Sequence, residues 1–353
     1  MYADAAPFFY DKGCDLTVMA TADDLGEFAT NFEKAGYSIL HLKMPPLNHY
    51  FKRILYYKST IELLKINNYD VVHIHASKAM WGFAFCSWLS NTQSVYTFHN
   101  VFPTNFYSYL YHVFLRVTSK YLFKCRFHTI SDSVYNHEKS LYFNNTEKIY
   151  NWYSDKRYYP ATDNEKQIIR KELKLQRDTL VLISVGGCSS IKRHSDILKA
   201  LKVILDKFPN TIYLHLGKGD LECEEQILAQ NLGISENVIF CNNQQDVRKY
   251  LIASDIYIMP SKFEGIPITT IEAMACGIPA ILYDVPGLRD FNKNGENCLL
   301  IQEDFILLAE MVIYLKCNSE KACEISMSAK NFVRRNFDLS KNVSKIIQLY
   351  NRI

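Results

Sequence analysis

The sequence predicts an α/β protein made of two doubly wound domains, each built on a parallel sheet. Short apolar runs typical of buried strands alternate with longer stretches of helical periodicity. The same alternation begins again after a polar stretch, Ser154 to Asp178, that is rich in lysine, arginine and aspartate. We place the domain boundary in that stretch. Because parallel strands need long crossover connections, strands separated by helices indicate parallel sheets.

The first half begins with a segment, Met1 to Lys12, that resembles the end of a helix, with Gly13 as its stop. A doubly wound domain normally opens with a strand and a glycine-rich turn, so the first strand of this domain is expected to be missing. The remaining elements follow in order. Strands are expected at residues 15–20, 38–42, 71–75, 94–98 and 127–130, and helices at residues 24–35, 50–66 and 79–89.

The second half repeats this order with more strongly apolar strands. Strands are expected at residues 180–185, 211–216, 238–240, 256–259 and 280–283, and helices at residues 194–208, 221–232, 247–253 and 269–275. The expected domains are residues 1–155, residues 156–335 and a final segment, residues 336–353. The two sheets are expected to face each other across a cleft, with the active site at the carboxyl ends of their strands.

Composition excludes several classes of protein. Forty basic and thirty-seven acidic residues give a net charge of +3, too small for a dedicated nucleic-acid binder. The ten cysteines show no pair at the spacing of a zinc site, so we expect no metal and free thiols in the cytoplasm. No secretory leader is recognisable at the start. Charged residues interrupt the longest apolar run, residues 106–127, so no membrane span is expected.

The most informative segment is residues 254–279, SDIYIMPSKFEGIPITTIEAMACGIP. A buried strand ends at Pro260, a turn follows, and a helix begins near Ile268. Amides at the start of a helix can hold a phosphate, and Glu264 and Glu272 can flank one ligand and accept hydrogen bonds from its vicinal hydroxyls. Alternatively, the two acids are a solvated turn residue and a capping or salt-bridging residue. The expected ligand-binding residues here are Glu264, Gly265, Ile266, Pro267, Ile268 and Glu272.

A second candidate element follows the first strand of the second half. Gly186 and Gly187 allow the backbone to approach a ligand closely, and Lys192 and Arg193 bring positive charge. Fixed cations stabilise the negative charge that develops on a leaving diphosphate. The alternative is an ordinary solvated basic loop.

These residues resemble a known family over nearly the whole chain. The segment with Glu264 and Glu272 is similar to the E-x7-E signature of retaining GT-B glycosyltransferases, particularly family 4 (glycosyl transferases group 1). The GT-B architecture consists of two Rossmann-like domains. Other stretches that resemble the family's motifs are Asn242 to Tyr250, Tyr283 to Gly287, Asn294 to Asn297 and Ile149 to Asp155, while Asn336 to Tyr350 resembles the helix that crosses back to the first domain.

The resemblance implies transfer of a hexose-type sugar from a UDP- or GDP-linked donor, with retention of anomeric configuration and no cofactor. It places the family's cleft histidine at His99 and its diphosphate lysine at Lys192. Gly187 stands where the family has an arginine, and Arg193 is the candidate substitute. The expected catalytic residues are therefore His99, Lys192, Arg193 and Glu264. The chain has no D-x-D tripeptide, the usual metal site of the other glycosyltransferase fold, so a metal-independent reaction is expected.

The acceptor side has an unusual composition, because no acidic residue occurs between Asp70 and Asp132. Basic and aromatic residues there suit the headgroup region of an anionic membrane, or they form an ordinary aromatic core with solvated lysines. The first reading predicts a peripheral enzyme at the inner face of the plasma membrane acting on a lipid-linked saccharide. The aromatic residues are Trp81, Trp88, Phe102, Phe106, Tyr107, Tyr109, Tyr111, Phe114, Tyr121 and Phe123.

Two other functions stay open. A nucleotide-sugar epimerase has the same two-domain architecture, but it needs acid and base carboxylates in the cleft. A truncated donor-binding protein without transferase activity would explain the missing first strand. The preferred reading is a transferase of cell-surface polysaccharide synthesis.

Overall fold

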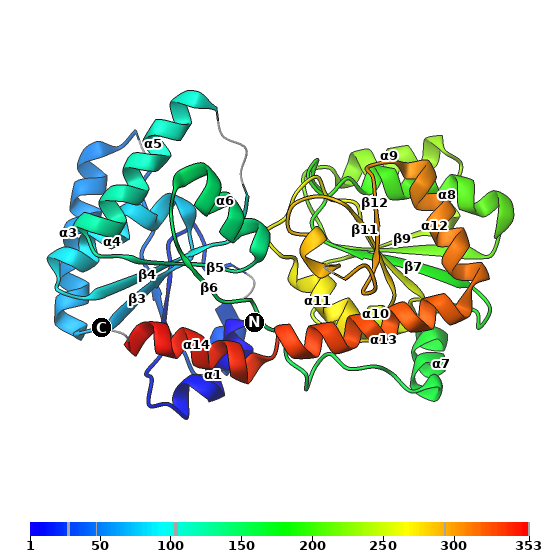
Figure 1. Ribbon diagram of the computed structural model, residues 1–353, viewed down its shortest axis with the longest axis horizontal. Coiled ribbons are helices and arrows are strands. Elements are labelled where there is room, and N and C mark those ends of the chain that lie inside the picture. The colour runs from blue at the N-terminus through cyan, green and yellow to red at the C-terminus, as the bar shows by residue number, and fades with distance from the viewer. Residues whose placement is uncertain (27–28, 47, 102–104, 293, 352–353) are drawn as a thin grey trace. The chain divides into compact units, whose positions relative to one another are not determined.

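The structure is a computed structural model that describes residues 1–26, 29–46, 48–101, 105–292 and 294–351. The chain forms two compact units (Figure 1). The first comprises Met1–Asn151 and Leu339–Ile353, and the second Trp152–Asp338. The sequence predicted the first boundary after residue 155 and the second after residue 335, so each prediction lies within four residues of the boundary in the structure.

The second unit is built on a six-stranded sheet in the order β12-β11-β10-β7-β8-β9, and all its recorded strand pairs are parallel. Helices cover both faces of the sheet, which is why its central strands are continuous apolar runs. The strands are β7 (Leu180–Val185), β8 (Thr211–Leu216), β9 (Val238–Asn242), β10 (Ile256–Met259), β11 (Ala280–Tyr283) and β12 (Leu299–Ile301). The helices are α7 (Asp163–Glu172), α8 (His194–Lys207), α9 (Glu222–Asn231), α10 (Val247–Ala253), α11 (Ile268–Ala275), α12 (Phe305–Cys317) and α13 (Ser319–Asn336).

The strand order reverses between β7 and β10. From β7 the chain builds outward through β8 and β9, then returns to place β10 on the other side of β7 and continues through β11 to β12. In an open parallel sheet this reversal leaves a crevice at the carboxyl ends of the two strands, because the following connections run in opposite directions. The loops after β7 and β10 are therefore the expected place for a ligand.

The first unit holds two separate parallel sheets among its described residues. One has the order β3-β4-β5-β6 and the other contains β1 and β2. That the first unit lacks the opening strand of a doubly wound domain stays a prediction from the sequence. The strands are β1 (Thr17–Ala20), β2 (Ser38–His41), β3 (Val71–Ile74), β4 (Gln93–Phe98), β5 (Arg126–Thr129) and β6 (Glu147–Lys148). The helices are α1 (Tyr2–Tyr10), α2 (Ala29–Lys34), α3 (Tyr50–Asn67), α4 (Met80–Leu89), α5 (Phe106–Val117), α6 (Asp132–Tyr142) and α14 (Leu339–Asn351).

The last helix, α14, completes the first unit and packs against α1. The hydroxyl of Tyr350 lies 2.6 Å from His73 Nδ1 on β3, and Arg126 Nη1 donates to the carbonyl of Leu349 (3.2 Å). The side-chain amide of Asn342 donates to the carbonyl of Asn151 (3.2 Å). These contacts join the end of the described chain to the unit in which the chain starts.

A buried ion pair holds α5 to α6 in the first unit. Arg116 donates to both carboxylate oxygens of Glu138, at 2.8 and 2.6 Å, and the side chain of Glu138 is 1% exposed. The guanidinium also lies 3.6 Å from the centre of the Tyr142 ring. A planar cation is well suited to this position because it can serve a carboxylate and an aromatic face together.

Several elements differ from expectation. Helix α7 lies inside the polar stretch that the sequence treated as a boundary, and α2 is shorter than the helix expected at residues 24–35, part of which falls outside the described residues. In α7, Thr162 caps the start by accepting from the amide of Glu165, and Arg170 is buried. Within the described ranges, every helix is too short or too polar to cross a bilayer.

Candidate donor site

The loops after β7 and β10 meet through an ion pair. Lys192 Nζ donates to Glu264 Oε1 at 2.6 Å, and the two side chains are 23% and 12% exposed. The backbone reinforces this contact, since the amide of Lys262 donates to the carbonyl of Ile191 at 2.8 Å. Two residues that the sequence singled out in separate motifs are thus neighbours at the reversal point of the sheet.

Glycines allow close backbone contacts among the loops after β7, β8, β10 and β11. A Cβ on Gly186 would lie 3.2 Å from Lys192 Cε, and one on Gly187 would lie 2.9 Å from the Lys218 carbonyl oxygen. Gly217, after β8, has φ +137°, and a Cβ there would lie 2.1 Å from the Gly186 carbonyl oxygen. Gly287 has φ +84°, and a Cβ there would lie 2.3 Å from the Glu264 carbonyl oxygen. Larger residues cannot occupy Gly217 or Gly287 without moving these loops.

The turn from Glu264 to Ile268 connects β10 to α11. The amide of Glu264 donates to the carbonyl of Pro286 at 3.0 Å, and Gly265, Ile266 and Pro267 are buried. Pro267 is the N-cap of α11, which begins at Ile268 as expected. The first-turn amides of a helix have no acceptor within the helix, and the positive end of the helix dipole lies there. The turn can therefore stabilise an anion.

Glu272 lies one turn inside α11 and is half-buried. Tyr158 lies next to the Glu272 carboxylate. Its pKa is raised, mainly by burial and to a smaller extent by the negative charge of Glu272. The tyrosine therefore stays neutral and hydrogen-bonds the carboxylate. Nothing in the sequence around Tyr158 indicated this role, because the residue lies in the polar stretch.

Arg193 is already engaged by acids. It occupies the left-handed region (φ 52°) at the N-cap of α8, where its guanidinium pairs with Asp196 at 2.8 Å and with Glu303. A cation neutralised twice is a weaker anion ligand than Lys192, whose ammonium has three donors and one recorded carboxylate partner.

His99 belongs to the first unit, directly after β4. Its Nε2 lies 3.0 Å from Nδ1 of His75, which follows β3. Burial lowers the pKa of His99 to about 4, so its imidazole is neutral near pH 7. It can donate or accept a hydrogen bond there, but it cannot supply a fixed positive charge.

Two further histidines lie within the same sheet. His128 Nε2 and His73 Nε2 each lie 2.6 Å from Thr97 Oγ1 on β4. Burial is the main cause that lowers the pKa of His128 to about 3 and that of His73 well below its usual range. His73 and His75 are two residues apart along the chain, so they point to one face, whereas His99 and His128 come to them only through the fold.

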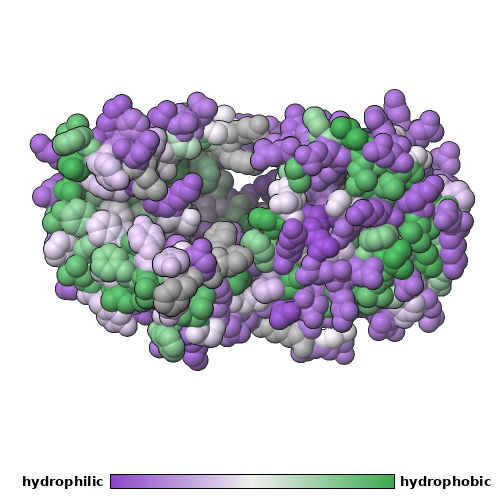
Figure 2. Space-filling view, turned by 90° about the horizontal axis from the view of Figure 1, so that it is seen from above, coloured by the Kyte–Doolittle hydropathy of each residue, from purple (hydrophilic) through white to green (hydrophobic). Residues whose placement is uncertain are grey.

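Two helices of the first unit expose apolar side chains to solvent, and Figure 2 shows hydrophobic residues among hydrophilic ones on the side that carries α3. On α5 the exposed residues follow helical spacing, so one face of this helix is apolar. Of the aromatic residues expected here, Phe123 is buried, while Phe102 and the side chain of Phe106 lie outside the described part. The exposed apolar residues are Tyr107, Leu110, Tyr111, Phe114 and Val117 on α5 and Tyr50, Phe51, Ile54, Leu55 and Ile66 on α3.

Two family profiles together match most of the chain. Residues 3–161 match Glycosyltransferase Family 4, and residues 165–332 match Glycosyl transferases group 1. Solved glycosyltransferases share the fold. A glycosyltransferase from Rickettsia africae is 20% identical, with a TM-score of 0.82 over 98% of this chain and 92% of that one. HepE of Anabaena, solved with UDP-glucose, is 19% identical, with a TM-score of 0.85 over 99% of this chain and 96% of its own.

The two units thus define a GT-B protein. The chain belongs to the family 4, group 1 glycosyltransferases.

Curated relatives align over varying shares of their length. An uncharacterised glycosyltransferase of Haemophilus influenzae is 31% identical over 144 residues, 40% of this chain and 41% of that protein. The N-acetyl-α-D-glucosaminyl L-malate synthase of Bacillus anthracis is 26% identical over 63% of this chain and 58% of its own. The UDP-Gal:α-D-GlcNAc-diphosphoundecaprenol α-1,3-galactosyltransferase of Escherichia coli is 25% identical over 83% of this chain and 78% of its own. The chain therefore matches 41% of the length of the first of these relatives and 58% of the second.

Proposed function

We propose that this protein transfers a hexose-type sugar from a UDP- or GDP-linked donor to a saccharide or lipid-linked saccharide, with retention of configuration, in cell-surface polysaccharide synthesis. The observation that carries the proposal is the Lys192–Glu264 pair at the reversal point of the second sheet. Two similar proteins support it: the name of the Escherichia coli galactosyltransferase gives UDP-Gal as its donor, and HepE was solved with UDP-glucose.

The donor's diphosphate would occupy the crevice between the glycine loop and the start of α11. Lys192 would share its ammonium between Glu264 and a phosphate oxygen, while the positive end of the α11 dipole, at Ile268, would stabilise the anion. Glu272, oriented by Tyr158, would accept hydrogen bonds from ribose hydroxyls, and Glu264 from hydroxyls of the sugar. Arg193 is a weaker candidate because Asp196 and Glu303 already bind it.

The reaction is a substitution at the anomeric carbon. The bond from that carbon to the donor phosphate oxygen breaks, and a bond to the acceptor oxygen forms on the same face. The acceptor proton passes to the departing phosphate oxygen, which leaves with the bonding electrons as part of the nucleoside diphosphate. Lys192 stabilises the charge on this leaving group, an effect worth roughly 3 kcal/mol or about 100-fold in rate. We expect the reaction to need no added divalent ion, and His99 to act as a neutral hydrogen-bond partner.

Binding of UDP, measured by calorimetry with GDP as the comparison, tests the donor site. Lys192→Ala should weaken binding about 10- to 100-fold, because a charge-assisted hydrogen bond contributes about 1.5–3 kcal/mol. Glu272→Ala should weaken it less. Lys202→Ala, which removes an exposed lysine from α8, is the matched control and should leave binding unchanged. If Lys192→Ala and Glu272→Ala both bind as the parent does, the donor site is misplaced.

Product analysis tests the reaction. Donor and a lipid-linked saccharide should give one glycoside whose anomeric proton, by NMR, has the donor's configuration, with or without added Mg²⁺ or Mn²⁺. Inversion would refute the retaining mechanism. Conversion of the donor sugar to its epimer without an acceptor would instead show an epimerase.

We propose further that an anionic membrane surface binds the exposed faces of α3 and α5. Tyr107 is 86% exposed, and residues three and four apart continue its apolar face along α5. Exposed lysines at Lys52, Lys58 and Lys65 accompany the apolar residues of α3. Aromatic and basic residues on one helix surface suit the headgroup region of anionic lipids. This would place the enzyme peripherally at the inner face of the plasma membrane.

Co-sedimentation with vesicles tests the membrane surface. The protein should bind phosphatidylglycerol vesicles and release as salt is raised, and it should bind phosphatidylcholine weakly. The double variant Tyr111→Ser/Phe114→Ser should bind several-fold less. The control Ile168→Ser removes an exposed apolar residue from α7 in the other unit and should bind normally. Equal binding of all three chains would refute this surface.

A further inference from the structure

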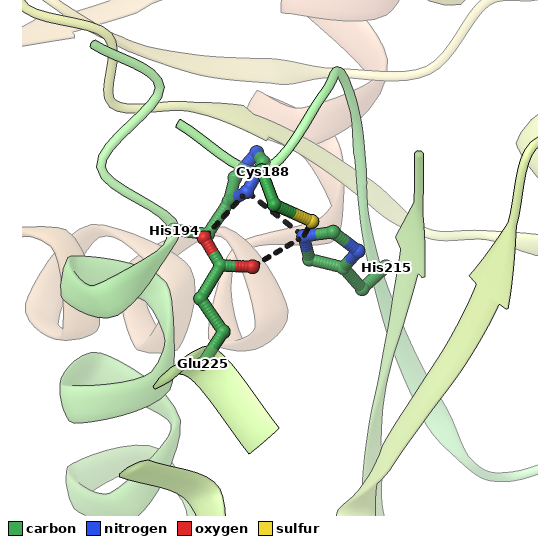
Figure 3. A group of neighbouring side chains, drawn as sticks. All are labelled: Cys188, His194, His215 and Glu225. Atoms are coloured by element: carbon green, nitrogen blue, oxygen red, sulfur yellow. Dashed lines mark hydrogen bonds and ion pairs between the residues drawn. The ribbon is translucent and has the colours of Figure 1, made fainter. Parts of the chain in front are cut away.

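Four buried side chains converge beside the glycine loop of the second unit. Cys188 directly follows Gly187, His194 begins α8, His215 lies on β8 and Glu225 lies on α9. Each side chain is buried, and Figure 3 shows their polar ends turned toward one another. One nitrogen, sulfur or oxygen atom from each residue lies within 4.8 Å of those of the other three.

The individual distances are short. His194 Nδ1 lies 2.8 Å from His215 Nε2 and 3.2 Å from Glu225 Oε1. His215 Nε2 lies 3.1 Å from Glu225 Oε2 and 3.8 Å from Cys188 Sγ. The two ring nitrogens and the carboxylate therefore form a closed triangle, with the sulfur beside it.

Protons satisfy this triangle poorly. Each ring nitrogen can direct at most one N–H inward, and the carboxylate has none. If both nitrogens are protonated, His194 can donate to Oε1 and His215 to Oε2, but the two N–H groups then lie 2.8 Å apart with no acceptor between them. If only one is protonated, the lone pair of the other ring nitrogen faces a carboxylate oxygen. Both arrangements bring like polar groups into close contact in a buried interior, which is costly.

We propose that these four residues bind one zinc-like divalent ion. A cation at the centre accepts every inward lone pair at once, and a thiolate with two imidazoles and a carboxylate is a donor set that suits Zn²⁺. In a tetrahedral zinc site, usual bond lengths put nitrogen ligands about 3.3 Å apart and nitrogen and sulfur about 3.6 Å apart. His194 Nδ1 and His215 Nε2, 2.8 Å apart, and His215 Nε2 and Cys188 Sγ, 3.8 Å apart, lie around those values, and all four ligand atoms lie within 4.8 Å of one another.

The charges also balance. One thiolate and one carboxylate neutralise the two positive charges of the ion, and the imidazoles stay neutral, so the buried centre carries no net charge. Binding releases the proton of the Cys188 thiol to solvent. Four protein ligands complete a tetrahedral shell, which is the arrangement of a structural zinc site and leaves no open position for a substrate.

The ion would anchor the glycine loop. The amide of Cys188 donates to the carbonyl of Lys218 (3.3 Å), and the amide of Leu221 donates to the carbonyl of Cys188 (3.3 Å). A bond from Cys188 to the ion would add a link from this loop to β8, α8 and α9. Gly186 and Gly187 lie immediately before Cys188, so the metal would fix the loop that we assign to the diphosphate.

Metal analysis of the full chain tests the proposal without depending on any activity. The protein is stripped with a chelator and titrated with Zn²⁺ against a chromogenic competitor, and separately with Co²⁺. We expect one ion per chain, and a cobalt spectrum with visible bands of tetrahedral geometry and a near-ultraviolet thiolate band. Absence of both bands and of stoichiometric zinc in the folded parent chain overturns the proposal, and it leaves the donor site to its own calorimetric test.

Matched variants identify the ligands. Cys188→Ser should remove the thiolate band and weaken zinc binding at least about tenfold, and His194→Gln should weaken it while keeping the band. Cys298→Ser changes another buried cysteine of the same unit and should keep both. If Cys188→Ser keeps both the zinc affinity and the thiolate band of the parent, the ion binds elsewhere. If Cys188→Ser does not fold, the parent cobalt spectrum and His194→Gln still decide.

Discussion

Gly217 offers the most direct test of the loop geometry. In Gly217→Ala the new Cβ would lie 2.1 Å from the Gly186 carbonyl oxygen and 2.6 Å from its carbon, at φ +137°. The backbone conformation alone costs about 1–3 kcal/mol for a residue other than glycine. Relieving the overlap by shifting packed backbone costs about 1–3 kcal/mol more. We therefore expect the free energy of unfolding to fall by roughly 4 kcal/mol.

Gly233→Ala is the matched control. Gly233 also has a positive φ (+69°), but a Cβ there would meet nothing within 4 Å. Only the conformational cost applies, about 1–2 kcal/mol. Urea denaturation of both variants, followed by far-ultraviolet circular dichroism, gives the comparison. The reasoning fails if the two variants lose the same stability, because the contact with Gly186 would then carry no cost.

Three further predictions concern buried groups. The pKa of His128 is about 3 in the folded protein, so below pH 6.5 the unfolded chain takes up a proton that the folded one does not. The free energy of unfolding therefore falls as the pH drops from 6.5 toward 3, by about 2 kcal/mol at pH 5. Urea titrations of His128→Gln should show a flatter pH dependence. Arg116→Met leaves the Glu138 carboxylate buried and should cost about 3–5 kcal/mol in urea denaturation, against under about 0.5 for the exposed Lys321→Met. Trp152→Ala should cost about 3–5 kcal/mol by the same measurement.

Each of these has a contradicting result. An unchanged pH dependence in His128→Gln would show that another group governs acid stability. Equal losses in Arg116→Met and Lys321→Met would show that the buried pair is not needed. A loss below about 1 kcal/mol in Trp152→Ala would mean that the indole is not packed as described.

The second unit could be predicted well from its sequence because its central strands are buried on both faces. Strands β7, β8, β10 and β11 have the bounds that their apolar runs indicated. Helix α7 was missed because its side chains are mostly polar and only one turn, at Arg170, is buried deeply. The sequence does carry a capping signal, Thr162 three residues before Glu165, but few apolar residues follow it to mark a packed helix face.

The donor site was predictable in part for a topological reason. Residues that follow parallel strands meet at one edge of a sheet, so Lys192 and Glu264 could be expected near each other before any coordinates. The engagement of Arg193 by Glu303, and of Glu272 by Tyr158, depends on residues distant in sequence and could not be predicted.

The proposed metal centre was beyond the reach of spacing rules. The sequence search required paired cysteines, and the expectation of no metal rested on their absence. Cys188, His194, His215 and Glu225 come from a loop, a strand and two helices, so only the fold assembles them.

The position of α14 has a consequence for biosynthesis. The first unit lacks Tyr350, the hydrogen-bond partner of His73 Nδ1, until residues near the end of the chain have been made. On the ribosome, the whole second unit emerges before that helix and can fold as an uninterrupted stretch. The earlier-translated unit therefore gains its last helix only after the later unit has been synthesised.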